Sequence, residues 1–249
     1  SLRRQRQMCI RDRSLTDLER LDVGCLDTGT PYGRDFPYQR PVHGQRIPTL
    51  SQLTEVLRQL GADEVLLNIE VKIDPRNPEW SPSPSAFATL LLKELDQIGW
   101  LGKSWVQSFD WRVLQAVLVQ EPVVPTGYLT SEQPGFNTVA VRGLNTSPWL
   151  AGFDPENFNG DLTLAIQEAG GRYWGPNYLD LTKGRIQKAH QVGLEVHTWT
   201  VNEPADIAKL SRWGVNGITS DYPDRARTAL GHLGVALPSP IVGELATGG

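Results

Sequence analysis

The sequence predicts an α/β fold built on a parallel sheet, and three observations support this prediction. Runs with the alternating pattern of strands take turns along the chain with runs that have the helical period. The 249 residues fit one large domain, since α/β barrels commonly fill about 250 residues. Charged and aromatic residues gather at the carboxyl ends of the predicted strands, where parallel-sheet proteins keep their binding sites.

The helical period appears first at residues 14–22 and again at residues 49–61, where Gly61 ends an apolar stripe. Six strands are predicted, at residues 65–72, 104–109, 123–130, 172–177, 194–201 and 215–221. A predicted helix lies in each interval between them, at residues 85–99, 111–120, 162–171, 182–193 and 204–214. Each strand therefore has a neighbouring helix, as in consecutive βα units.

Six strands are too few for a closed barrel, which needs eight. A doubly wound sheet tolerates six strands, but the sequence has no Gly-rich dinucleotide fingerprint. We therefore predict an incomplete TIM (β/α)8 barrel that consists of strands 3 to 8, with the first two βα units missing. Residues 1–13 have neither period, and we expect them to be a non-native leader. Residues 14–236 would form the partial barrel and residues 237–249 a loose tail.

Composition argues against several classes of function. The formal net charge is -4 without a long basic block, which argues against a nucleic-acid partner. No run approaches the roughly 18 apolar residues of a membrane span. The cysteines, Cys9 and Cys25, are too few to predict a disulfide framework or a cysteine-based metal site, and Cys9 falls within the expected leader.

The strand at residues 65–72 gives the clearest indication of a site. Side chains alternate along a strand, so Leu66, Asn68, Glu70 and Lys72 share one face, which turns from apolar to charged toward its carboxyl end. The structural alternative is that Glu70 and Lys72 only neutralise each other. Glu70 alone cannot hold a hard cation, since Ca²⁺ takes about six to eight oxygen ligands and Mg²⁺ about six.

The other strand ends also carry polar or aromatic groups, namely Gln107 and Phe109, Tyr128, Trp174 and Asn177, Trp199 and Asn202, and Ser220 and Asp221. In a barrel these positions converge on one mouth and would surround a small polar ligand. Trp199 could instead fill the hydrophobic core, as aromatic residues of strands usually do. Asp221 is predicted to cap the helix that follows it rather than to take part in catalysis. His197 is predicted to lie one layer below the mouth.

Four segments of the chain, in this order, resemble the bacterial glycerophosphodiester phosphodiesterases: LLNIEVK, VQSFDWRVLQAV, the run LT…AH..GL.V..WTVNEP, and WGVNGITSDYPDR. The resemblance extends from about Ser14 to about Leu230. The stretch LDVGCLDTGTPYGRDFPYQRPVHGQRIPTL also resembles the loop that follows the second catalytic histidine in the secreted or periplasmic branch. A periplasmic or secreted location is therefore implied, with any signal peptide upstream.

The resemblance implies metal-dependent hydrolysis of a small-molecule glycerophosphodiester to sn-glycerol 3-phosphate and an alcohol. It implies that Glu70 binds a divalent cation, Ca²⁺ or Mg²⁺, and that Lys72 faces the substrate phosphate. Trp199 would pack against the glycerol, and Gln107 and Phe109 would line the same mouth. A cation beside an ammonium would stabilise the charge that builds on phosphorus during attack by water.

The His-Arg-Gly, Glu-x-Asp and His-Asp motifs of the family cannot be placed in this sequence, and we expect them upstream of Ser14. The chain then offers no catalytic acid or base, and we expect it to be inactive, since such groups contribute about 10²–10⁴-fold. The alternatives are a noncatalytic barrel with a binding or scaffold role and a related phospholipase-type phosphodiesterase. A glycoside hydrolase is a weaker candidate, because Glu70 has only Asp221 as a second carboxylate.

Overall fold

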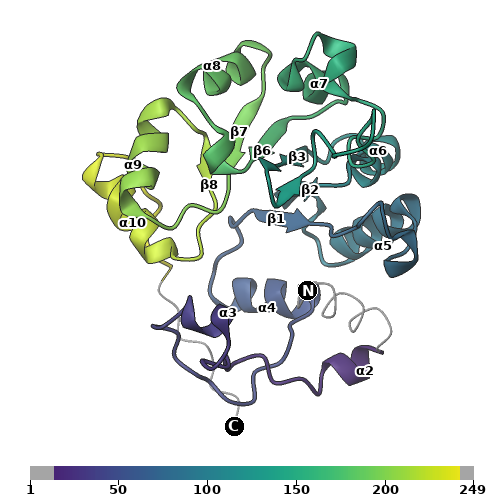
Figure 1. Ribbon diagram of the computed structural model, residues 1–249. Helices are drawn as coiled ribbons and strands as arrows, with labels where there is room; N and C mark the ends of the chain where they lie inside the picture. Colours follow the sequence, from purple (N-terminus) through teal and green to yellow (C-terminus); the bar gives the residue numbers. More distant parts are fainter. Residues whose placement is uncertain (1–13, 242–249) are drawn as a thin grey trace. The chain divides into compact units, whose positions relative to one another are not determined.

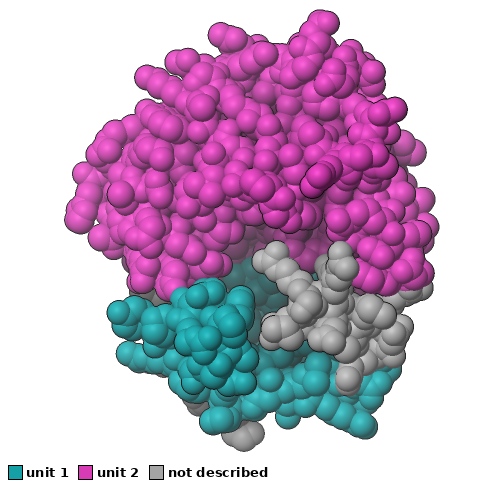
Figure 2. Space-filling model, in the orientation of Figure 1, with its two compact units in different colours: residues 1–59 teal, residues 60–249 magenta. Residues whose placement is uncertain are grey.

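The computed structural model describes residues 14–241 and divides the chain into two compact units, residues 1–59 and residues 60–249 (Figure 2). Unit 2 contains the predicted sheet with its helices. Unit 1 contains helices and long loops. Within the described residues, every helix is too short or too polar to cross a membrane.

Unit 2 is built on a six-stranded sheet in which all neighbouring strands run parallel (Figure 1). In spatial order the strands are β1 (Leu67–Glu70), β2 (Ser104–Ser108), β3 (Thr126–Thr130), β6 (Tyr173–Pro176), β7 (Glu195–Thr198) and β8 (Gly217–Ile218). After β3 the chain forms an antiparallel hairpin of β4 (Glu132–Gln133) and β5 (Phe136–Asn137). The predicted α/β class and parallel sheet are confirmed, and the sheet is curled like part of a barrel.

Helices alternate with the strands and form an arc around the curled sheet (Figure 1). They are α5 (Pro84–Gln97), α6 (Trp111–Gln120), α7 (Leu162–Glu168), α8 (Lys183–Gln191), α9 (Pro204–Trp213) and α10 (Pro223–His232), with the 3₁₀ helices η1 (Pro78–Trp80), η2 (Leu101–Lys103), η3 (Pro155–Phe158) and η4 (Tyr178–Asp180). Side chains of Ser83, Asp110, Asp161 and Thr182 cap the first turns of α5 to α8. Proline occupies the first position of α9 and α10.

The helix-facing side of the sheet forms the core of unit 2. Val106, Tyr128, Trp174 and Val196 come from four neighbouring strands and are fully buried. The expectation that Tyr128 and Trp174 face the mouth is therefore wrong, since both pack on the helix side. Trp111 of α6 packs edge-on against Tyr128, with ring centroids 4.8 Å apart, and burial raises the pKa of the Tyr128 hydroxyl. Because side chains alternate, the residues between these core positions face the concave side of the sheet.

Unit 1 contains α2 (Leu15–Leu18), α3 (Pro31–Arg34) and α4 (Leu50–Gln59). Ser14 and Asp17 form a capping box at the start of α2. The carboxylate of Asp22, in the loop before α3, accepts the backbone N–H of Gly44 from the loop after α3 and that of Gly24, and both bonds lower its pKa. These bonds order a part of unit 1 that has no regular secondary structure.

Several elements are shorter than predicted. The first strand spans Leu67–Glu70 rather than residues 65–72, and the sixth is reduced to Gly217–Ile218. In the described part, β1 and β8 each pair with one neighbour only, so their ends lack a second ladder of hydrogen bonds. The helix predicted at residues 14–22 is limited to Leu15–Leu18.

The predicted leader, residues 1–13, lies outside the described residues, as do residues 242–249 of the predicted tail. The incompleteness of the barrel and the domain limits at residues 14 and 236 stay predictions.

We predict that Asp110→Ala lowers the free energy of unfolding by about 2–3 kcal/mol, because it removes a helix cap and a charge-assisted hydrogen bond. Asp110 is fully buried and accepts hydrogen bonds from the backbone N–H of Arg112 at 3.1 Å and from its guanidinium at 2.6 Å. Urea denaturation followed by circular dichroism measures the change. Asp206→Ala is the control, since its ion pair with Lys209 is partly exposed and is worth less than about 1 kcal/mol. Equal losses in the two variants would contradict the prediction.

Candidate active site

Glu70 and Lys72 lie together at the carboxyl end of β1. The Glu70 Oε1 and Lys72 Nζ atoms are 2.5 Å apart, and the side chains are 27% and 63% exposed, respectively. The neutralising contact that the sequence offered as an alternative therefore exists. The ammonium group nevertheless remains accessible to solvent, so the contact does not exclude a role in binding an anion.

Gln107 lies beside Glu70 because β1 and β2 pair in parallel with these two residues in register. The backbone N–H of Val71 donates to the Gln107 carbonyl oxygen at 2.9 Å. Phe109 follows on the same face as Gln107, and its ring is perpendicular to that of Trp199 with centroids 5.3 Å apart. The predicted site residues thus come from three strand ends that open at the same edge of the sheet.

Two aromatic residues that sequence reasoning missed complete a cluster at this edge. Phe136 of β5 and Trp149 pack edge-on against Phe109, with ring centroids 5.0 and 6.4 Å away. We call Phe109, Phe136, Trp149 and Trp199 the mouth aromatic cluster. Phe136 and Trp149 belong to the long connection between β3 and α7, where the sequence has no period that could have indicated their position.

A second ion pair lies against this cluster. The guanidinium of Arg76 is 5.1 Å from the ring centroid of Trp149 and donates two hydrogen bonds to Asp74, at 2.8 and 2.7 Å. Burial raises the pKa of Asp74, but the hydrogen bonds from Arg76 outweigh it and lower the pKa overall. Asp74 is therefore a charged carboxylate that already has a cationic partner.

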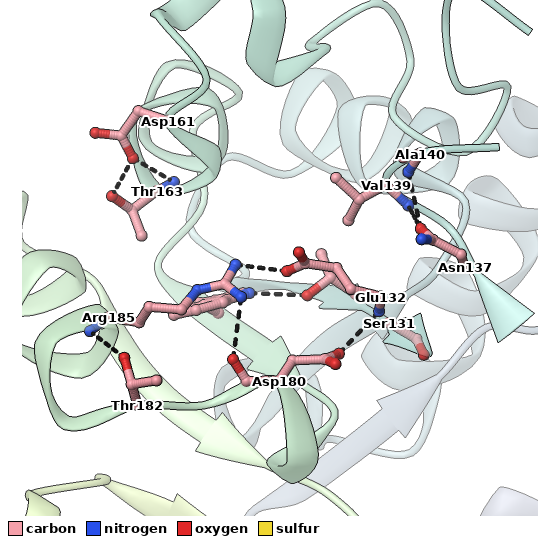
Figure 3. A network of polar contacts seen from close by, with 12 residues as sticks. Ser131, Glu132, Asn137, Val139, Ala140, Asp161, Thr163, Asp180, Thr182 and Arg185 are labelled. Atoms are coloured by element: carbon pink, nitrogen blue, oxygen red, sulfur yellow. Dashed lines mark hydrogen bonds and ion pairs between the residues drawn. The ribbon is translucent and has the colours of Figure 1, made fainter. Parts of the chain in front are cut away.

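A polar network at the ends of β3 and β6 fixes the hairpin that carries Phe136 (Figure 3). Arg185 of α8 donates to the Glu132 carboxylate at 2.5 Å and to the Asp180 carbonyl oxygen at 3.0 Å. The Asp180 carboxylate accepts the Glu132 backbone N–H at 2.8 Å and a bond from the side chain of Gln133. The hairpin is thus tied to the loop after β6, which holds one wall of the mouth aromatic cluster in place.

His197 lies on the concave face, one layer below the mouth, as predicted. Its ring contacts Trp105 and Tyr173, with centroids 5.7 and 4.9 Å away, and its Nε2 lies 3.5 Å from Glu195. Trp105 and Tyr173 also line a hollow of about 150 Å³ at the amino ends of β2 and β6. Burial lowers the pKa of His197 despite the opposing effect of Glu195, so the ring is neutral at pH 7.

The prediction that Asp221 caps the last helix is wrong. Helix α10 begins at Pro223 after Tyr222, and no side chain caps it. The carboxylate of Asp221 instead accepts a bond from the Asn202 amide at 2.9 Å, while Ser220 and the Asp221 N–H donate to the Asn202 oxygen at 3.1 and 2.9 Å. Proline at the first helical position has no N–H group that needs a capping partner. Asp221 is therefore available to bind Asn202, and these bonds link the loop after β8 to the loop after β7.

Comparison with known proteins identifies the family. The sequence profile of the glycerophosphoryl diester phosphodiesterase family matches residues 4–225, which is most of the chain. The chain belongs to this family. A crystal structure from Silicibacter pomeroyi, named provisionally as a glycerophosphoryl diester phosphodiesterase, is 31% identical and superposes with a TM-score of 0.76. The match covers 91% of this chain and 70% of that protein.

A curated relative agrees with membership of the glycerophosphoryl diester phosphodiesterase family, and a further solved structure agrees with the fold. YhdW of Bacillus subtilis, also named provisionally, is 26% identical over 215 residues, which are 86% of this chain and 70% of YhdW. An Oleispira antarctica phosphodiesterase, solved with the product sn-glycerol-3-phosphate, has a TM-score of 0.60 at 19% identity, over 88% of this chain and 71% of its own. The latter supports the fold alone, whereas the family resemblance of the sequence is confirmed by the profile.

We predict that lowering the pH from about 7.5 to 5.5 destabilises the wild-type protein more than the His197→Gln variant. The folded pKa of His197 is lowered, so the unfolded chain binds more protons, and stability is lost as the pH falls through the unfolded value of about 6.5. Urea unfolding at both pH values measures this difference. His232→Gln, at the exposed end of α10, should retain the wild-type pH dependence. Equal pH dependence in wild type and His197→Gln would disprove the effect.

Proposed function

We propose that the chain binds a glycerophosphodiester at the mouth of its sheet and is the substrate-binding part of a glycerophosphodiester phosphodiesterase. The observation that carries the proposal is the accessible Lys72 ammonium, held by Glu70 at the same edge of the sheet as Phe109 and Trp199. Membership of the family supports the reaction, which is hydrolysis to sn-glycerol 3-phosphate and an alcohol. The Oleispira antarctica phosphodiesterase was solved with that product.

Lys72 is the residue that we assign to the substrate phosphate. A phosphodiester is an anion, and its oxygens accept charge-assisted hydrogen bonds from an ammonium group. The contact of Lys72 with Glu70 is exposed on the Lys72 side, at 63%, whereas the Glu70 side chain is 27% exposed, and partly exposed ion pairs of this kind contribute little to stability. A phosphate can therefore replace the carboxylate at Lys72 at low cost, which leaves Glu70 free for another ligand.

The aromatic and amide groups of the mouth suit the glycerol part of the substrate. The perpendicular rings of Phe109 and Trp199 form an apolar corner that can cover the carbon–hydrogen face of a polyol. The side-chain amide of Gln107 has both donor and acceptor atoms for a hydroxyl group. We assign these three residues to substrate binding, with Trp199 against the glycerol.

Glu70 is the ligand that we propose for the divalent cation, Ca²⁺ or Mg²⁺, that the family resemblance implies. The described mouth residues do not complete such a site by themselves, because these ions take about six or more oxygen ligands. Asp74 lies beyond the end of β1, four residues after Glu70, but its carboxylate is bound to Arg76. We therefore assign no catalytic step to a cation, and a complete site requires oxygen ligands besides these.

Within the described part of unit 2, no histidine contacts Glu70 or Lys72: His232 lies exposed at the end of α10, and the other two have different partners. His190 contacts Asn216, and His197 packs with Tyr173 below the mouth. A positioned general acid or base typically raises the reaction rate about 10²–10⁴-fold, and these histidines do not lie at the Glu70–Lys72 pair to supply it. The described residues therefore favour substrate binding over hydrolysis. A noncatalytic binding or scaffold role is therefore the second candidate function.

A phospholipase-type phosphodiesterase would differ from the first candidate in the substrate that it hydrolyses. A periplasmic or secreted location of the protein stays a prediction.

We predict that Lys72→Ala lowers the affinity for sn-glycerol 3-phosphate about 10–100-fold, the equivalent of one hydrogen bond to a charged group. Isothermal titration calorimetry on the whole chain measures the dissociation constant. Lys209→Ala is the matched control, because Lys209 lies on α9 in an ion pair with Asp206. An unchanged affinity in Lys72→Ala would refute the role of Lys72, and no binding by the wild type would refute the binding proposal.

We also expect this polypeptide to release no choline from glycerophosphocholine above the buffer rate, with either Ca²⁺ or Mg²⁺ present. The reason is that no histidine in the described part of unit 2 contacts the Glu70–Lys72 pair. A coupled choline assay is the measurement. Metal-dependent release that Lys72→Ala abolishes would overturn this expectation and would establish the chain as a hydrolase.

A further inference from the structure

A group of potential metal ligands lies in unit 1, where Asp22, Cys25 and His43 converge. A carboxylate oxygen, the Sγ atom and a ring nitrogen all lie within 4.8 Å of one another, and Cys25 Sγ is 3.3 Å from His43 Nδ1. Among residues 14–241, it is the one such group of at least three histidine, cysteine or acidic side chains. Asp22 and His43 are exposed and Cys25 is half-buried, so an ion from solvent can reach them.

The backbone holds the two segments that supply these ligands side by side. The N–H of Val23 donates to the Gln45 carbonyl at 2.9 Å, and the N–H of Val42 donates to the Gly24 carbonyl at 3.0 Å. A Cβ atom at Gly24 would lie 1.9 Å from the Val42 carbonyl oxygen, so only glycine permits this approach. The convergence of the three side chains therefore follows from a specific backbone pairing.

The carboxylate of Asp22 is also oriented by the backbone. Its Oδ1 accepts the N–H of Gly24 at 3.0 Å, and its Oδ2 accepts the N–H of Gly44 at 2.8 Å. A carboxylate has about four lone-pair positions, so both oxygens can accept a further partner. Hydrogen bonds of this kind are what orients carboxylate ligands in metal sites.

We propose that Asp22, Cys25 and His43 form a binding site for a transition metal ion of the Zn²⁺ type. A thiolate, an imidazole and a carboxylate are the ligand types of zinc sites, and usual metal–ligand distances place tetrahedral ligand atoms about 3.4–3.6 Å apart. The pair Cys25 and His43 is already near this spacing, and small rotations bring in Asp22. The fourth position is open to water.

This site differs in chemistry from the one proposed at Glu70. Ca²⁺ and Mg²⁺ prefer oxygen ligands, whereas a thiolate with an imidazole selects softer ions such as Zn²⁺ and Co²⁺. The inference is therefore independent of the proposed hydrolysis, and either can fail without the other.

Co²⁺ titration of the metal-stripped whole chain tests the proposal, because a thiolate ligand produces a charge-transfer band that no oxygen site gives. We expect a saturable band in the wild type that Zn²⁺ displaces. Cys25→Ser should abolish the band. His43→Ala and Asp22→Asn should weaken Co²⁺ binding more than about tenfold, since even the outer partners of metal ligands typically contribute that much.

Two variants serve as matched controls. Cys9→Ser removes the other cysteine, and His232→Ala removes an exposed histidine of α10; both should bind Co²⁺ like the wild type. Circular dichroism confirms that each variant is folded. The proposal is overturned if the wild type shows no saturable band, if Cys9→Ser removes it, or if folded His43→Ala binds with unchanged affinity.

Discussion

Parallel pairing of β1 with β2 in a single register is the constraint on which the mouth depends. The ladder sets Glu70 opposite Gln107, and the Ser108 hydroxyl reinforces it with a bond to the Val71 carbonyl oxygen at 2.7 Å. Because side chains alternate, the register fixes both the face and the height of each residue. Phe109 must then follow on the concave face at the carboxyl end, where it meets Trp199, the residue after β7.

The ion pairs around the mouth have different physical roles. Arg185 binds Glu132 and the Asp180 carbonyl together, so several bonds would have to break before the hairpin could move. Glu70 and Lys72 share a single contact that is exposed on the lysine side, where water or an anion can replace it with little loss of free energy. Both are short ion pairs, but the Arg185 network suits a structural role that positions the hairpin, whereas the Glu70–Lys72 pair suits the binding of a ligand.

Height along the strands separates two environments on one face. Trp105, Tyr173 and His197 fill the lower layer with rings that meet edge-on or tilted, and burial favours the neutral form of His197. Nearer the carboxyl ends, Phe109, four residues after Trp105, and Trp199, two residues after His197, reach the open edge. Residues that share the concave face therefore form part of the packed interior in the lower layer, whereas those at the carboxyl ends of the strands form a candidate binding surface.

The sequence by itself determined the features that depend on local period and spacing. These are the α/β class, the six parallel strands, the common face of Glu70 and Lys72, and the family resemblance. Tertiary structure alone decided which distant segments meet. Phe136 and Trp149 arrive from a connection without period, Asp221 is drawn to Asn202 rather than to α10, and Cys25 meets His43 across 18 residues. Periodicity specifies the face that a residue presents, whereas backbone pairing and packing between segments decide which residue it contacts.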